Sequence, residues 1–181
     1  IFWTIGGGST LKDWVERRYL DDLGVPQVYL FDSDCTSAAL PPEKVKEDRV
    51  KDINARANCE AFVSRQRTIE KYAHPDAFAR LTGGMVTLPA ALDMDFDRVD
   101  KAFATALEAA KKIAGFAYYP DDHNGNALAP NKQNAKKIIT SHLMRHMTAD
   151  EIKARGAYTD PPGTSGNEIL EWLLAIRQHL A

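Results

Sequence analysis

Hydrophobic positions in the first part of the chain alternate between strand and helix patterns. The run from Ile1 to Ile5 is β-branched and aromatic, and the Gly-Gly-Gly-Ser-Thr turn after it can cap a following helix. Residues 11–23 carry apolar side chains at nearly helical spacing, and Gly24 is suited to end that helix. Residues 25–31 (VPQVYLF) are apolar almost throughout, as in a strand buried on both faces. This order of elements predicts a βαβ unit with a parallel sheet.

The pattern changes towards helices along the chain. Residues 41–57 predict an exposed helix opened by Pro42, and residues 60–63 predict a short third strand. Later segments predict helices that alternate with polar loops: helices over 97–115, 134–146, 148–155 and 167–179, loops over 119–131 and 159–165. Thr148 and Glu151 have the spacing of a helix capping box. The predicted fold is α/β, with a parallel sheet flanked by helices over residues 1–75 and a mainly α-helical region over residues 76–181.

Composition sets limits on the function. A chain of 181 residues with 44% hydrophobic residues can bury a sizeable core, and its net charge of −2 gives no global basic footprint for nucleic acid. Any DNA contact therefore has to come from local patches. Cys35 and Cys59 have neither metal-ligand spacing nor a disulfide framework, so we expect buried or half-buried free thiols and a reducing cytoplasm. We expect no membrane span, since no apolar run approaches the required length of about 20 residues.

Two aspartates follow directly after the second predicted strand. Side chains two positions apart on a strand share a face, so the carboxylates of Asp32 and Asp34 can point to one place at the carboxyl edge of the sheet. Two neighbouring anions repel unless a cation lies between them, and Mg²⁺ prefers carboxylate oxygens. The pair predicts a metal site, although solvated loop aspartates are a common alternative.

A third acid and two arginines follow the third predicted strand. Glu70 can reach the same sheet edge, and Arg65 and Arg67 are suited to bidentate contacts with DNA phosphates. The alternative for Glu70 is an acid in the first turn of a helix, where the helix dipole favours it.

Three motifs together resemble a known family. The sequence GGGS, then LGVPQVYLFDSD, then FVSRQRTIEKY is similar to the Toprim region of the OLD-family ATP-dependent nucleases. The resemblance covers residues 1–75. Beyond it, Met147-Thr148 and the E-I-L-x-W segment from Glu168 to Trp172 resemble the family's C-terminal region with looser motifs.

This resemblance implies a Toprim-like fold and an endonuclease that uses two Mg²⁺ or Mn²⁺ ions to hydrolyse phosphodiesters in DNA. It implies four metal-binding residues in this chain: Asp32, Asp34, Ser64 and Glu70. A lysine of the helical region would stabilise developing charge, with Lys136 and Lys137 as candidates. The alternative for both lysines is a solvated helix face.

The departures from the family pattern concern the start of the chain. The family has a glutamate on a first strand and a nearby acid on the next helix, both before the glycine turn, and neither is present here. Since the chain opens within a strand on Ile1, we expect an upstream part to be missing, which would leave one metal position incomplete and the fragment inactive. The expected partners are DNA, an N-terminal ATPase domain of the same natural polypeptide and a second copy in a full-length dimer.

Other candidate sites are given simpler interpretations. We interpret Asp93, Asp95 and Asp97 as the N-terminal cap of the next helix, and His142 with His146 as an exposed helix pair without a third zinc ligand. Among other Toprim chemistries, a topoisomerase needs a nucleophilic tyrosine, and Tyr72 lies too near the ligand motif. The alternative of another class is a non-catalytic Toprim-like module that binds DNA or a partner.

Overall fold

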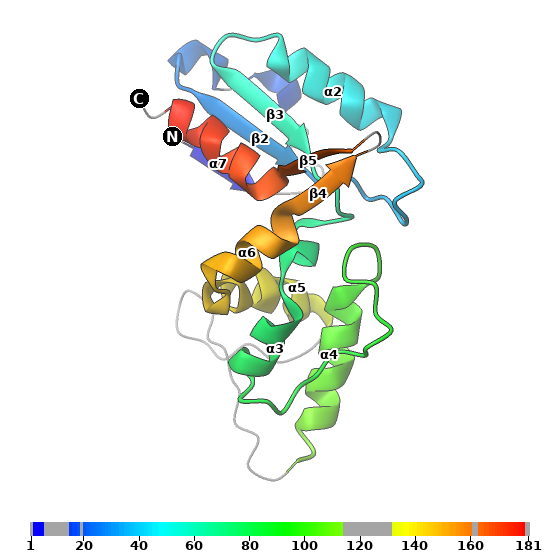
Figure 1. Cartoon of the computed structure of the whole chain (residues 1–181). Helices are drawn as coiled ribbons and strands as arrows, with labels where there is room; N and C mark the ends of the chain where they lie inside the picture. Colours follow the sequence, from blue (N-terminus) through cyan, green and yellow to red (C-terminus); the bar gives the residue numbers. More distant parts are fainter. Residues whose placement is uncertain (1, 6–14, 19, 114–131, 161–162, 180–181) are drawn as a thin grey trace. The chain divides into compact units, whose positions relative to one another are not determined.

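The computed structural model describes residues 2–5, 15–18, 20–113, 132–160 and 163–179. The chain forms two compact units: the first contains Ile1–Thr68 and Gly156–Ala181, and the second contains Ile69–Arg155. Figure 1 follows both units by colour along the sequence.

The first unit is built on a parallel sheet of three strands. These are β1 (Phe2–Ile5), β2 (Gln27–Phe31) and β3 (Cys59–Val63), in the order β1-β2-β3. The register pairs Phe2 with Gln27, and Gln27 with Cys59. The predicted parallel sheet and its third strand are confirmed, and β2 is the central strand.

Helix α2 (Lys44–Asn54) packs on one face of this sheet through Ile53, which contributes to a core with side chains of the central and third strands. That core consists of Val15, Tyr29, Phe31, Ile53 and Ala61. The expectation that Pro42 opens the helix is wrong. The N-cap residue Glu43 is still extended, with ψ 131°, so the helix starts at Lys44.

The helix predicted over residues 11–23 is only partly within the described residues. Residues 15–17 are helical, but Arg18 has a positive φ of 52°, so this helix does not continue to Leu23. A short 3-10 helix, η1 (Asp21–Leu23), follows and ends at Gly24 with φ 62°. The predicted role of Gly24 as a left-handed terminating residue is confirmed.

The C-terminal segment contains a hairpin that the sequence pattern did not predict. Strands β4 (Ala157–Asp160) and β5 (Thr164–Asn167) pair antiparallel, where we expected a loop over 159–165. Tyr158 pairs with Gly166, and a side chain on Gly166 would collide with the Tyr158 hydroxyl. Gly166, directly after the expected loop, is therefore required by a close cross-strand contact.

Helix α7 (Glu168–Gln178) lies beside the sheet in the first unit (Figure 1). Its first residue, Glu168, accepts a hydrogen bond from the Arg65 backbone N–H at 2.8 Å, and His179 Nε2 lies 3.8 Å from Glu60 Oε2. Glu60 and Ala61 point to opposite faces, and Ala61 faces the core under α2, so α7 covers the other face. Residues 156–181 therefore belong with the sheet, whereas the sequence pattern predicts one helical region over residues 76–181.

The second unit is mainly helical, as expected. Its elements are η2 (Ile69–Tyr72), α3 (Pro75–Leu81), α4 (Val99–Ala110), α5 (Lys132–Ser141), η3 (Leu143–His146) and α6 (Ala149–Gly156), whose last residue belongs to the first unit. Phe78 and Phe103 meet edge to face at 4.9 Å in a core with Leu107 and Ile138. The loop expected over 119–131 lies outside the described residues.

The predicted capping box at the start of α6 is confirmed. The Thr148 N–H donates to Glu151 Oε2 at 2.8 Å, and the Glu151 N–H donates to Thr148 Oγ1 at 3.2 Å. Within the described part of the chain, no helix has both the length and the apolar character needed to cross a membrane.

Candidate metal centre at the end of the central strand

Asp32 and Asp34 follow the carboxyl end of the central strand. β2 ends at Phe31, and Asp34 adopts a left-handed backbone with φ 56°, so the strand geometry that would place both carboxylates on one face does not extend to Asp34. Asp32 is half-buried, Ser33 is buried and the Asp34 side chain is 59% exposed. The acid pair thus lies on a bend rather than on a strand, at the sheet edge where ligands of parallel sheets bind.

Hydrogen bonds fasten this bend to the loop after β3. The Ser33 N–H donates to Ser64 Oγ at 3.1 Å, and the Ser33 hydroxyl donates to the Gln66 carbonyl at 2.8 Å. The Asp34 N–H donates to the Arg67 carbonyl at 2.9 Å. Since these groups are largely buried and bonded to each other, the two loops hold the backbone around the acids in one arrangement.

Ser64 differs from the metal ligand that the resemblance implies. Its hydroxyl accepts from the Ser33 N–H and donates to the Gln66 carbonyl at 2.8 Å, and only 1% of the residue is exposed. This geometry gives Ser64 the role of positioning the loop that carries the acids.

A lysine that the sequence reasoning missed lies against the acid pair. Lys46, in the first turn of α2, donates from Nζ to the Asp32 carbonyl at 2.8 Å and forms an ion pair with the Asp34 carboxylate. The helix after the DSD motif was predicted as charged and exposed, but only the fold indicates which of its lysines turns towards the aspartates. The oxygen atoms of Asp32 and Asp34 therefore attract a positive charge to this end of β2.

The two predicted phosphate-binding arginines have other contacts in the structure. The Arg65 guanidinium lies 3.5 Å from the centre of the Tyr158 ring and 2.6 Å from Asp160 Oδ1. Arg67 is half-buried, and its backbone carbonyl accepts a hydrogen bond from the Asp34 N–H. Any phosphate contact by Arg65 would have to compete with Asp160.

Glu70, Lys136 and Lys137 belong to the second unit. Glu70 lies in η2, is only 5% exposed, and its Oε1 lies 3.0 Å from Lys136 Nζ. Its Oε2 has no hydrogen-bond partner among the described residues. Lys137 is half-buried on α5. The structure therefore brings together one predicted acid and one predicted lysine.

The second unit contains another charged pair besides Glu70 and Lys136, formed by Arg98 and Asp100. Arg98 donates to both carboxylate oxygens of the buried Asp100, at 2.9 and 2.6 Å. These hydrogen bonds from Arg98 are the main reason that the pKa of Asp100 lies below its usual range. The attraction between the Asp100 carboxylate and the charges of Arg98 and Lys136 contributes less. Asp100 was not identified from the sequence, because its partner is fixed by a bend just before α4.

The acids over 93–97 do not cap α4 as expected. Arg98 is the N-cap and makes no side-chain capping bond. Asp93 instead accepts from the Asp95 and Phe96 N–H groups, and Asp95 forms an ion pair with Arg155 at 2.5 Å. The acids close a turn that precedes the helix.

The histidine and cysteine interpretations agree with the structure in part. His142 follows α5 and His146 ends the 3-10 helix η3, so the two residues do not share one α-helical face. Cys35 is buried and Cys59 half-buried, both as free thiols, and burial is the main cause that raises the pKa of Cys59.

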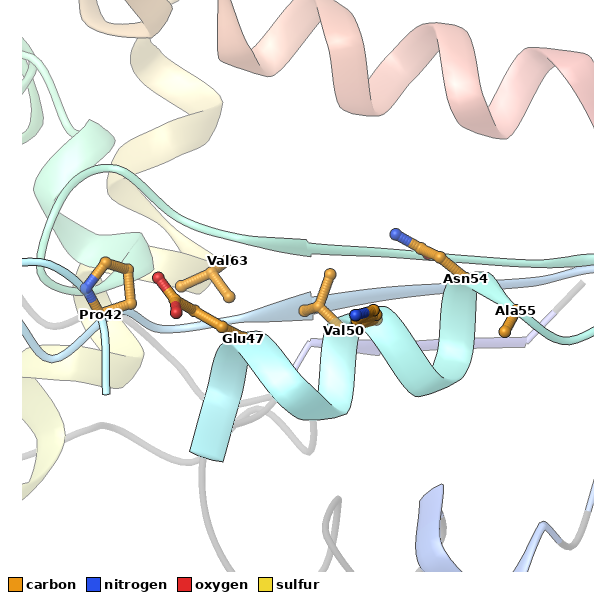
Figure 2. Close-up of a pocket in the computed structure, with 7 residues that line it drawn as sticks. Pro42, Glu47, Val50, Asn54, Ala55 and Val63 are labelled. Atoms are coloured by element: carbon orange, nitrogen blue, oxygen red, sulfur yellow. The ribbon is translucent and has the colours of Figure 1, made fainter. Parts of the chain in front are cut away.

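The pocket in Figure 2 is a different surface of the first unit. It is lined by α2 residues, including Glu47, Val50 and Asn54, together with Pro42 and Val63. The residues that line this pocket are a mixture of apolar, amide and charged side chains, and they do not form a convergent set of catalytic or metal-binding groups.

The donor chemistry at the end of β2 suits a hard divalent cation. The carboxylate of Asp34 is accessible, Asp32 lies two residues away, and an ammonium group already contacts both residues. Comparisons with protein-family models, curated proteins and solved structures gave no match.

Proposed function

We propose that this chain is the catalytic region of a metal-dependent DNA endonuclease similar in type to the Toprim nucleases of the OLD family. The observation that supports it best is the acid bend at the end of the central parallel strand, fastened through Ser33 and Ser64 and contacted by the ammonium of Lys46. The motif resemblance is the support for the family and for a DNA substrate.

In this proposal Asp32 and Asp34 hold Mg²⁺ or Mn²⁺, and a role for Glu70 as a further metal ligand rests on the sequence resemblance alone. When bound, such ions activate water and stabilise the negative charge that develops on the phosphate and the leaving oxygen. The hydrogen bonds of Ser33 and Ser64 fix the ligand loop, which reduces the reorganisation needed on binding. Lys136 supplies positive charge beside Glu70, and the same role for Lys137 is the alternative.

The wider biology follows from the resemblance alone. We propose that the chain acts with an ATPase domain of its natural polypeptide, as part of a dimer, in the cytoplasm. Contacts of Arg65 and Arg67 with DNA phosphates belong to the same proposal.

Calorimetry with Mn²⁺ followed by plasmid nicking tests the function. Loss of a group that only supports a metal ligand lowers metal affinity by about 10–100-fold. Asp32→Ala and Asp34→Asn each change a proposed ligand, so each should weaken Mn²⁺ binding by at least this factor. Both variants should also abolish Mn²⁺-dependent nicking. Asp48→Asn, an exposed acid on α2 paired with Lys44, is the matched control and should behave as wild type.

The non-catalytic alternative predicts a different result. DNA binding and Mn²⁺ binding that are both unaffected by Asp32→Ala would favour a binding module and contradict the nuclease.

A further inference from the structure

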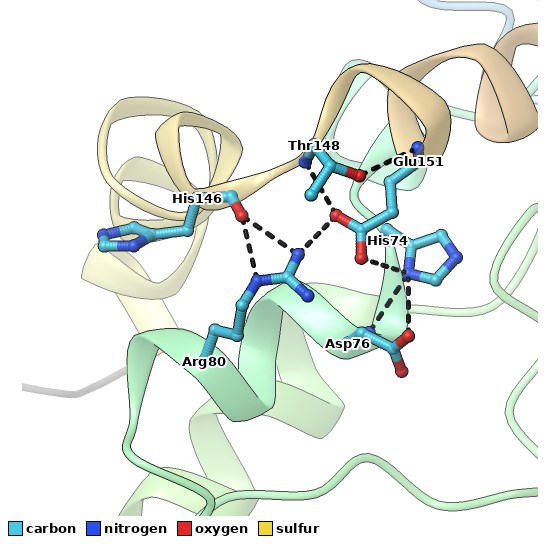
Figure 3. A network of polar contacts seen from close by, with 6 residues as sticks. All are labelled: His74, Asp76, Arg80, His146, Thr148 and Glu151. Carbon is cyan, nitrogen blue, oxygen red and sulfur yellow. Dashed lines mark hydrogen bonds and ion pairs between the residues drawn. The ribbon is translucent and has the colours of Figure 1, made fainter.

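His74, Asp76 and Glu151 converge in the second unit, at the starts of α3 and α6 (Figure 3). One ligand atom of each residue lies within 4.8 Å of the other two. His74 Nδ1 is 3.5 Å from Glu151 Oε1 and 3.7 Å from Asp76 Oδ2. This cluster shares no residue with the proposed nuclease site.

The hydrogen bond at His74 makes the arrangement informative. As the N-cap of α3, His74 accepts the Asp76 N–H at Nδ1 over 3.2 Å, so Nδ1 acts as an acceptor in this arrangement. The two carboxylate oxygens therefore face another acceptor. Three acceptors that face one another are stabilised by a cation, and an unprotonated imidazole nitrogen is the form that binds metals.

The distances agree with coordination better than with hydrogen bonding. Separations of 3.5 and 3.7 Å are longer than the normal range for a hydrogen bond. Ligand atoms around a tetrahedral Zn²⁺, each about 2.0–2.1 Å from the ion, lie about 3.3 Å apart. Small side-chain rotations, at the expense of the long bond from the Asp76 N–H, would bring these atoms to that spacing.

Supporting groups orient the Glu151 carboxylate. Its Oε2 accepts from the Thr148 N–H at 2.8 Å and pairs with Arg80, which also donates to the His146 carbonyl at 2.9 and 3.1 Å (Figure 3). Oε1 is thereby turned towards His74 and Asp76. Metal-binding carboxylates are commonly fixed by partners of this kind.

We propose that His74, Asp76 and Glu151 form a binding site for a divalent transition-metal ion of the Zn²⁺ type. The nitrogen and carboxylate donors suit Zn²⁺, and three protein ligands leave a fourth position for water. By joining the starts of α3 and α6, the ion would stabilise the helical unit.

Zinc titration of the metal-free full chain tests the site by calorimetry and thermal melting. Wild type should bind one Zn²⁺ and melt at a higher temperature with the ion. Asp76→Asn should weaken binding at least tenfold and lose the thermal shift, while circular dichroism verifies its fold. This variant is mild, because the Asp76 side chain is 72% exposed and the cap bond uses its backbone N–H. His74→Ala should lose zinc binding at this cluster together with the thermal shift.

A matched variant separates this site from other binding. Asp150→Asn removes an exposed acid beside Glu151 and should bind zinc as wild type does. The proposal is overturned by the absence of saturable zinc binding, by unchanged binding in Asp76→Asn, or by loss of zinc binding in Asp150→Asn.

Discussion

At the scale of single residues, the ammonium of Lys46 occupies a position beside the acids that we propose as metal ligands. It contacts the Asp32 carbonyl and the Asp34 carboxylate, and its side chain is largely buried. A cation in this position competes with a divalent ion for the same oxygens.

Lys46→Met should therefore raise Mn²⁺ affinity. One charge contact at a solvated site is worth about 1 kcal/mol, so the expected gain is about fivefold. Calorimetry measures it, with Lys44→Met, which removes an exposed lysine from the same helix, as the control. Unchanged or weaker binding by Lys46→Met would show that the lysine and the ion do not share this position.

Asp100 gives a second test, through its pH dependence. Its pKa is lowered in the folded state, first by the hydrogen bonds from Arg98, so this pair stabilises the fold above the unfolded-state pKa of about 4. The contribution is lost as the pH falls through the lower, folded-state pKa. Asp100→Asn should cost about 1.5–3 kcal/mol of unfolding free energy at pH 7 and progressively less below about pH 4.

Urea unfolding at several pH values measures this difference. Glu108→Gln, an exposed acid on the same helix, is the control and should remain within about 0.5 kcal/mol of wild type. A cost of Asp100→Asn that did not shrink in acid would contradict the account of the Arg98 pair.

The positions of the two aspartates could be predicted, because a run of apolar residues fixes where β2 ends. The contacts of Lys46 and Arg65 could not, because each partner comes from another element of the fold, and the contact of Asp100 could not, because it depends on a local bend before α4. Asp34 also shows a limit of strand periodicity, since its left-handed backbone begins the bend.

At the scale of elements, Phe103 joins α4 to α3. It is fully buried and meets Phe78 edge to face at 4.9 Å. Phe103→Ala should destabilise the chain by about 3–5 kcal/mol, because it removes this contact and leaves a cavity.

Thermal or urea unfolding measures the effect, with Phe103→Leu as a variant that refills most of the volume. The leucine variant should retain more stability than the alanine variant. Equal stability of the alanine variant and wild type would contradict the position of Phe103 in the core.

Elements with strong local signals were predictable. The apolar runs gave the parallel strands, and the Thr148 and Glu151 pair gave the start of α6. The β4 and β5 hairpin was missed because its strands are four residues long and contain polar and glycine residues. Tyr158 of β4 also packs against Arg65, which lies far away in the sequence.

At the scale of the whole molecule, the chain leaves the sheet unit at Thr68 and returns to it at Gly156. Sequence composition indicated where the helical region begins but not that the chain returns, because α7 resembles the other helices in its pattern. Its place is set by the contacts of Glu168 and His179 with the strand β3 and the loop after it.

The location of a bound Mn²⁺ tests the central claim most directly. Paramagnetic broadening of backbone amide signals in two-dimensional NMR identifies the residues nearest the ion. The experiment uses the Asp76→Asn background, which removes the proposed zinc site at His74, Asp76 and Glu151. Broadening should then be strongest at Ser33, Asp34 and Cys35 and should extend to the loop from Ser64 to Arg67. It should vanish when Asp34→Asn is added. Broadening centred on any other segment, or unchanged by Asp34→Asn, would contradict a metal centre at the end of the central strand.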